Sequence, residues 1–249
     1  MKTRPDALLL AATLLSFLQI SAANADSVTV PCDRDNTLYE STTGALSNGA
    51  GSTMFAGRTN QPSNSRRRAL VHFDLAAAVP PGSTITAVSL TLNASQVSSV
   101  TPQAVALHRA LADWGEGASN AGDPGGSGAL AAAGDATWKH RFFNTTLWAA
   151  LGGDFVAGPS GQLAVGDVGP WTWTGAPGML LDAQVWLDTP GANFGWLLTG
   201  DESSGATTKR FDTRESGDPA ARPSLHLDYT PAGTPAASAS WGRLKASYR

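Results

Sequence analysis

The sequence has one cysteine, few charged side chains and no apolar run of membrane-spanning length. Cys32 is the only cysteine among 249 residues, so no disulfide can form within the chain. Charged residues make up 15% of the sequence and the formal net charge is −3, which argues against nucleic acid as a partner. The longest apolar run, at residues 7–20, falls short of the roughly 20 residues that a spanning helix needs. We expect no membrane span in the mature chain.

Sequence motifs of common enzymes are also missing. The chain contains no G-x-S-x-G nucleophile elbow, no H-E-x-x-H zinc motif and neither of the common glycine-rich phosphate-binding motifs. Its four histidines are far apart in sequence. A polysaccharide lyase would need a tyrosine or histidine base beside an arginine. The sequence has only three tyrosines, Tyr39, Tyr229 and Tyr248. We predict that the protein is not an enzyme and keep a lyase as the third hypothesis.

The first 25 residues resemble an export signal. Lys2 and Arg4 precede the apolar run, and Ala23-Asn24-Ala25 has the small-x-small pattern that signal peptidase recognises. Cleavage after Ala25 would remove a net charge of about +1 and leave a mature chain that begins at Asp26. We therefore predict a secreted, extracellular or cell-surface protein. An exported chain with one cysteine is more typical of bacteria than of eukaryotes.

Residues 26–231 read as a single all-β domain, followed by an Ala/Ser/Pro-rich linker and tail at 232–249. Glycine (27) and proline (15) are abundant, and short alternating apolar stretches lie between the turns. In the segment 85–94, Val88, Leu90 and Leu92 should point inward. Other strands are expected at 37–40, 53–57, 68–74, 105–107, 162–173, 194–199, 207–213 and 223–229, and one short helix at 179–187. This pattern predicts a single antiparallel, jelly-roll-like β-sandwich.

Four stretches, in their order along the chain, resemble motifs of the DNRLRE domain. This is an extracellular bacterial and archaeal β-sandwich family akin to carbohydrate-binding modules. The stretches are Asp35-Asn-Thr-Leu-Tyr-Glu40, Arg68-Ala-Leu-Val-His-Phe-Asp-Leu75, Asp113-Trp114-Gly-Glu116 with Thr137-Trp138, and Phe211-Asp-Thr-Arg-Glu215 with Arg222-Pro-Ser-Leu225. The resemblance spans nearly the whole mature domain and implies a secreted, non-enzymatic module, some relatives of which bind polysaccharide. It also implies structural roles for Trp114, Trp138, Arg68, Glu215 and Arg222.

Residues 113–148 form a long, aromatic-rich loop, and about 20 residues separate Glu116 from Thr137 where the resembled family has only a few. Long structured loops often carry function. We expect a polysaccharide site on this loop rather than on a sheet face, with some of its aromatic rings facing solvent to stack on sugar rings. The predicted ligand-binding residues are Trp148, Phe142, Phe143, Arg141, Lys139 and Glu116. The pair Trp171 and Trp173 could equally belong to the core or form a flat platform.

Two further alternatives stay open at this point. The protein could be a structural or adhesive cell-surface component with no sugar site. No cofactor is evident, but a structural calcium ion is compatible with the carboxylates of the sequence. The candidate calcium ligands are Asp33, Asp35, Asp201, Glu202 and Asp218.

Overall fold

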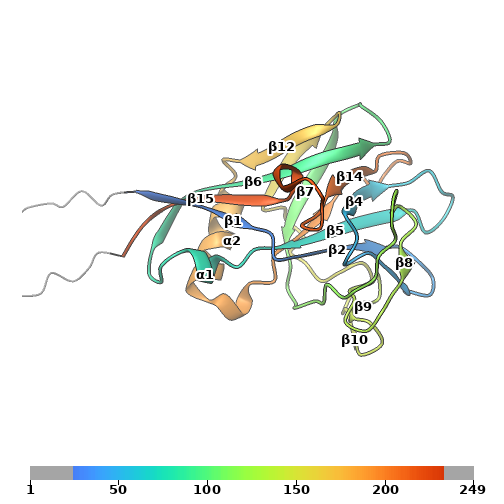
Figure 1. Cartoon of the computed structure of the whole chain (residues 1–249), viewed down its shortest axis with the longest axis horizontal. Coiled ribbons are helices and arrows are strands. Elements are labelled where there is room, and N and C mark those ends of the chain that lie inside the picture. Colours follow the sequence, from blue (N-terminus) through green and yellow to red (C-terminus); the bar gives the residue numbers. More distant parts are fainter. Residues whose placement is uncertain (1–24, 233–249) are drawn as a thin grey trace, which may run out of the picture.

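The computed structural model describes residues 25–232, and the predicted export signal and tail fall almost wholly outside that range. Antiparallel strands dominate the structure (Figure 1). The strands are β1 (Asp26–Pro31), β2 (Arg34–Tyr39), β3 (Leu46–Ser47), β4 (Thr53–Arg58), β5 (Arg66–His72), β6 (Thr84–Val97), β7 (Gln103–Arg109), β8 (Ala129–Leu130), β9 (His140–Phe142), β10 (Thr146–Leu147), β11 (Gly161–Val165), β12 (Gly169–Thr174), β13 (Trp196–Thr199), β14 (Lys209–Asp212) and β15 (Ser224–Thr230). The helical segments are α1 (Leu75–Ala78), α2 (Pro177–Asp188), η1 (Pro190–Ala192) and η2 (Pro219–Ala221). Within residues 25–232, no helix is both long and apolar enough to span a membrane.

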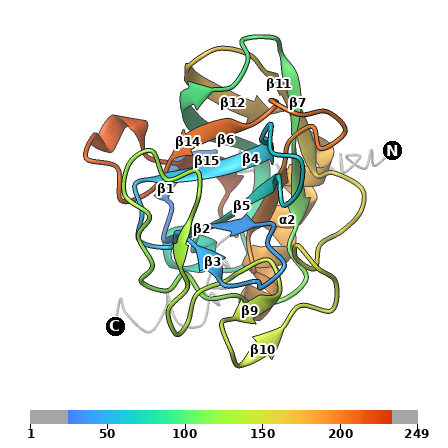
Figure 2. The same cartoon turned by 90° about the vertical axis from the view of Figure 1, so that its right-hand side faces the viewer.

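One large sheet follows the strand order β1-β15-β6-β14-β4-β5-β13-β7-β11, with β12 added on β6 and β2 added on β5. Strand β4 joins its two halves, because its first residues pair with β14 whereas Gly57 and Arg58 pair with β5. Gly57 has φ +115°, and a Cβ there would come within 2.9 Å of the Thr207 carbonyl oxygen. The sheet therefore curls at a position that requires glycine. Figure 2 shows the curl from the side.

The main hydrophobic core lies between the two halves of the curled sheet. The prediction for β6 is confirmed, because Val88, Leu90 and Leu92 are all buried in this core. Val71 of β5 and Leu107 of β7 belong to the same core and come from the other half. Alternation places every second residue of a strand on one face, so these apolar positions cover a continuous inner surface. The mostly-β antiparallel fold is thus as expected.

The predicted helix is confirmed as α2, which begins at Pro177, a residue suited to the first turn of a helix. Its buried Trp186 packs against Trp196 of β13, with ring centroids 4.6 Å apart. The expected strand at 162–173 is instead two strands: β11 pairs with β7, whereas β12 pairs with β6 on the other half. That division came from Gly166 and Gly169, at positions where turn residues interrupt the alternation.

Two features of the fold were not expected from the sequence. Strand β1 covers the edge of β15 along its whole length, from Asp26 opposite Tyr229 to Pro31 opposite Ser224. Lys209 of β14 is fully buried, and its ammonium group donates hydrogen bonds to the carbonyl oxygens of Ser99 (2.6 Å) and Gly166 (2.9 Å). These bonds compensate for burial of the charge and hold the β6–β7 and β11–β12 connections together.

Candidate functional site

The loop 113–148 lies against the outer face of the half-sheet that contains β2, β5 and β13. Leu38, Leu70 and Leu197 point away from the main core and form a second hydrophobic cluster with residues of the loop. The loop contributes Trp114, Ala136, Trp138 and Trp148 to this cluster. Its β9–β10 hairpin projects from the body of the molecule in Figures 1 and 2. The loop is thus anchored by its own aromatic side chains.

The two tryptophans that the family resemblance marks as structural are buried. Trp114 is 0% exposed, and its indole N–H donates a 2.8 Å hydrogen bond to the Phe194 carbonyl. Trp138 is 5% exposed, and the guanidinium of Arg68 lies over its ring at 5.0 Å from the centroid. A buried indole needs a partner for its N–H, and a stacked guanidinium adds a cation–π contact. Both rings therefore pack as expected.

Trp148 corrects one expectation, because its ring does not face solvent. Its side chain is 6% exposed and its indole N–H donates a 2.9 Å hydrogen bond to the carbonyl of Thr137. The neighbouring Leu147 is the exposed residue, at 63%. The reason is local: the β9–β10 hairpin returns the chain to the sheet. Strand β10 ends at Leu147, which points outward, and the next residue, Trp148, points inward. This ring has no face free for stacking on a sugar.

The other predicted ligand-binding residues are half-buried, and several are engaged within the chain. Phe142 is half-buried and Phe143 lies edge-on to His140, with centroids 5.4 Å apart. The guanidinium of Arg141 donates to the Asp113 carbonyl oxygen at 3.2 Å. The ammonium of Lys139 donates to the Thr42 carbonyl oxygen at 2.5 Å. A role for this hairpin in binding stays a prediction.

Arg68 and Arg222 make contacts within the fold. Arg68 forms a bidentate pair with Glu202, with N–O distances of 2.7 and 2.9 Å, and also donates to the Gly152 carbonyl at 2.9 Å. Arg222 donates from Nε to the Ser216 carbonyl at 3.0 Å. The planar guanidinium suits such fixed multiple contacts.

A groove of about 510 Å³ lies on the part of the outer sheet face that the loop leaves open. Cross-strand register explains its shape, because Ala106 of β7 stands between Gln162 of β11 and Thr199 of β13. Ala104 lies two residues before Ala106 on the same face of β7. These two small side chains form a floor that is lower than its polar borders. The described residues that line the groove are Gln103, Ala104, Ala106, His108, Pro159, Gln162, Thr199, Gly200 and Asp201.

His108 at one end of this groove has a defined hydrogen-bonding arrangement. Its Nδ1 lies 2.9 Å from the carbonyl oxygen of Val156, which can only accept, so Nδ1 carries the proton in the neutral ring. Its Nε2 then accepts from the hydroxyl of Thr199 at 3.1 Å. Within residues 25–232, the side-chain amide of Gln162 makes no hydrogen bond, and its side chain is exposed. Gln162 is thus free to bind a ligand.

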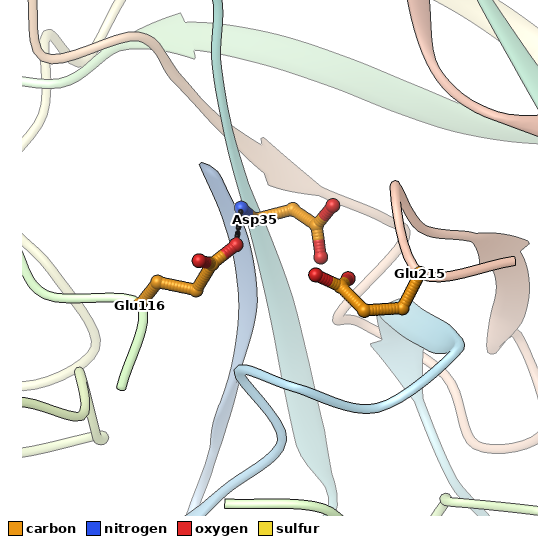
Figure 3. A group of neighbouring side chains, drawn as sticks. All are labelled: Asp35, Glu116 and Glu215. Carbon is orange, nitrogen blue, oxygen red and sulfur yellow. Dashed lines mark hydrogen bonds between the residues drawn. The ribbon is translucent and has the colours of Figure 1, made fainter. Parts of the chain in front are cut away.

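A second polar feature lies where β2, the loop 113–148 and the turn after β14 meet (Figure 3). Asp35, Glu116 and Glu215 come from these three segments, and one oxygen from each lies within 4.8 Å of the others. Arg214 bridges the group: its guanidinium donates to both oxygens of Glu116 at 2.6 Å and contacts Glu215 at 2.9 Å. Figure 3 shows the carboxylates of Asp35 and Glu215 pointing toward each other.

These carboxylates are unusually placed for ionised groups. Asp35 is 0% exposed, and burial together with the nearby Glu215 and Glu116 raises the pKa of its carboxyl well above the ordinary value. Burial also raises the pKa of Glu215. The contacts of Arg214 with Glu116 also raise the pKa of its guanidinium, and for this group a higher pKa favours the charged form.

The structure does not bring the predicted calcium ligands together. Only Asp35 belongs to the acidic group; Asp33 contacts His72 Nδ1 at 2.6 Å and Glu202 pairs with Arg68. The two remaining candidates stay local: Asp201 accepts from Ser203, and Asp218 from the Ala220 N–H. From the sequence, Glu116 was predicted to bind sugar and Glu215 to have a structural role, and neither was predicted to join an acidic group. Their proximity could not be predicted because it joins positions far apart in the chain.

Comparison with known proteins adds no family assignment. No family model matches the chain, and no curated protein matches it either. The resemblance to the DNRLRE domain therefore stays an interpretation of the motifs.

Proposed function

We propose that this protein is a secreted, non-catalytic module that binds extracellular polysaccharide in the groove between β11, β7 and β13. We further propose that the fold is a jelly-roll-like sandwich of the DNRLRE type. The main support for the binding site is the row Gln162, Ala106, Thr199, in which polar side chains border a floor of small ones. Sugars are recognised by such combinations of amides, hydroxyls and carboxylates around a shallow apolar floor.

The charge of the groove favours a neutral chain of sugars. Among the described residues that line the groove, Asp201 is the only aspartate, glutamate, lysine or arginine. A polyanion would need cations, yet Arg67 is 3% exposed and Arg68 is paired with Glu202. An uncharged glycan therefore fits better than an acidic one.

The alternatives have less support. A lyase would need an accessible base, but Tyr39 is buried with its hydroxyl bonded to the Gly125 carbonyl, and Tyr229 is 8% exposed. Both ring nitrogens of His108 already have partners. A structural or adhesive surface component without a sugar site needs no groove, and it becomes the leading hypothesis if no glycan binds.

Residues 26–231 on an array of neutral and acidic glycans, followed by calorimetry of any hit, test the proposal. Ala104→Trp should fill the groove and weaken binding at least about tenfold, which corresponds to about 1.4 kcal/mol. Gln162→Ala removes one hydrogen-bonding side chain and should weaken binding by roughly three- to tenfold. Ser27→Trp, at an exposed position of β1 on the other half of the sheet, is the matched control and should bind normally.

Binding that survives Ala104→Trp but is lost in Phe143→Ala would contradict the groove and place the site on the β9–β10 hairpin. Failure to bind any glycan at millimolar concentration would contradict polysaccharide binding itself.

A further inference from the structure

The acidic group holds two buried oxygens that have no hydrogen-bond partner among the described residues. Five buried side-chain nitrogen or oxygen atoms within residues 25–232 lack a hydrogen bond, and two of them are Asp35 Oδ1 and Glu215 Oε2. Asp35 is fully buried, and its other oxygen accepts from the Arg214 backbone N–H at 2.9 Å. Native proteins rarely leave a buried carboxylate oxygen unpaired, so a missing partner is expected between these two residues.

The charge of the group indicates what kind of partner that is. When ionised, Asp35, Glu116 and Glu215 carry three negative charges, and Arg214 supplies one positive charge in direct contact. The nearby Arg34 is already paired with Asp113 at 3.0 Å. The uncompensated charge is therefore −2, which one divalent cation would neutralise.

We propose that Asp35, Glu116 and Glu215 bind a calcium ion that joins β2, the loop 113–148 and the turn after β14. Carboxylate oxygens in an irregular arrangement, completed by carbonyl groups or water, suit Ca²⁺, whereas Mg²⁺ demands a near-ideal octahedron. Structural zinc sites are instead built mainly from cysteine and histidine ligands, and no histidine belongs to this group of described residues. The thiol of Cys32 donates a hydrogen bond to Asp35 Oδ2 over 3.7 Å and is therefore already engaged.

Arg214 is a positioning residue in this site. Its guanidinium holds both oxygens of Glu116 and one of Glu215, and its backbone N–H holds Asp35. The carboxylates are thereby oriented before the ion binds, which lowers the entropic cost of binding. The ion would sit beneath the surface, since Asp35 is fully buried, and would act on stability rather than on a ligand outside. This inference does not depend on the proposed glycan groove.

The test uses the whole exported protein after treatment with a chelator, and calcium chloride as the only added ligand. Thermal unfolding should show a saturable rise in melting temperature of several degrees, and calorimetry should give a single site. Magnesium chloride at the same concentration should produce a much smaller rise.

Asp35→Asn and Glu215→Gln are nearly isosteric and remove one ligand charge each, so each should weaken calcium binding at least tenfold. Two variants are used so that poor folding of one does not decide the result. Asp218→Asn is the matched control, because asparagine also caps the short helix η2 and leaves the acidic group intact. This control should respond to calcium as the unaltered protein does.

Three results would overturn the proposal. The first is a melting temperature that millimolar calcium does not change; a proton shared by Asp35 and Glu215 would then be the missing partner. The second is calcium binding that persists undiminished in both variants, which would place the ion elsewhere. The third is an equal response to magnesium, which would remove the assignment to calcium.

Discussion

Burial of Trp148 changes the role that its residue type suggests. A tryptophan in a polar, glycine-rich loop looks like a ring for stacking on sugars, but here it helps to attach the loop to the sheet. Its neighbours in the second hydrophobic cluster include Leu70 and Leu197, which point outward from β5 and β13. Without the three tryptophans of this cluster, Trp114, Trp138 and Trp148, the outer face of the half-sheet would expose leucines to water.

Trp148→Ala should therefore lower the free energy of unfolding by roughly 3–5 kcal/mol, because it leaves a cavity and removes the indole hydrogen bond. Urea unfolding measures the change. Leu147→Ala, at the exposed neighbouring position, is the control and should stay within about 0.5 kcal/mol. A Trp148→Ala protein as stable as the control would show that the ring is not part of the packed cluster.

Strand β1 has a clear role among the elements. It pairs with β15 along six residues, and Val30 is 3% exposed in the main core. The strand thus closes an edge that would otherwise present unpaired backbone groups to other molecules.

A chain that begins at Asp33 should be less stable than one that begins at Asp26. Loss of a buried valine and a row of backbone hydrogen bonds should lower the melting temperature by at least about 5 °C. Calorimetry measures this, and size-exclusion chromatography should reveal association through the exposed edge of β15. Equal melting temperatures and a monomeric truncated chain would mean that β1 contributes nothing to the sheet.

For the whole molecule, the first strand that the structure describes begins at the residue after the predicted cleavage point. Asp26 is the first residue of β1, and it lies opposite Tyr229, next to the end of β15. Both ends of the described chain leave the same side of the molecule in Figure 1. Of the residues that the structure describes, cleavage after Ala25 would remove only Ala25, which lies outside β1.

Mass spectrometry of the exported protein should accordingly find a mature chain that begins at Asp26. Lys2, Arg4 and the apolar run should be absent from it. The control is the same chain with Ala23 and Ala25 both replaced by bulky residues, which should stay unprocessed. A mature chain that begins within β1, or one that retains the apolar run, would contradict the prediction.

The sequence alone determined the local elements. Strict alternation in 85–94 specified which side chains face the core, and the residues of 179–187 specified the helix that the structure shows as α2. These features could be predicted because the period of a strand or helix is contained within a few consecutive residues. The motif tryptophans Trp114 and Trp138 were likewise correctly expected to pack.

Only the tertiary structure decided which of these elements meet. The groove depends on the register that sets Gln162, Ala106 and Thr199 side by side, and the acidic group depends on contact between β2, the loop 113–148 and the turn after β14. Burial of Trp148 depends on where the hairpin returns to the sheet. Pairing between distant segments is governed by the packing of the whole core. A local pattern of residues therefore does not predict which segments pair.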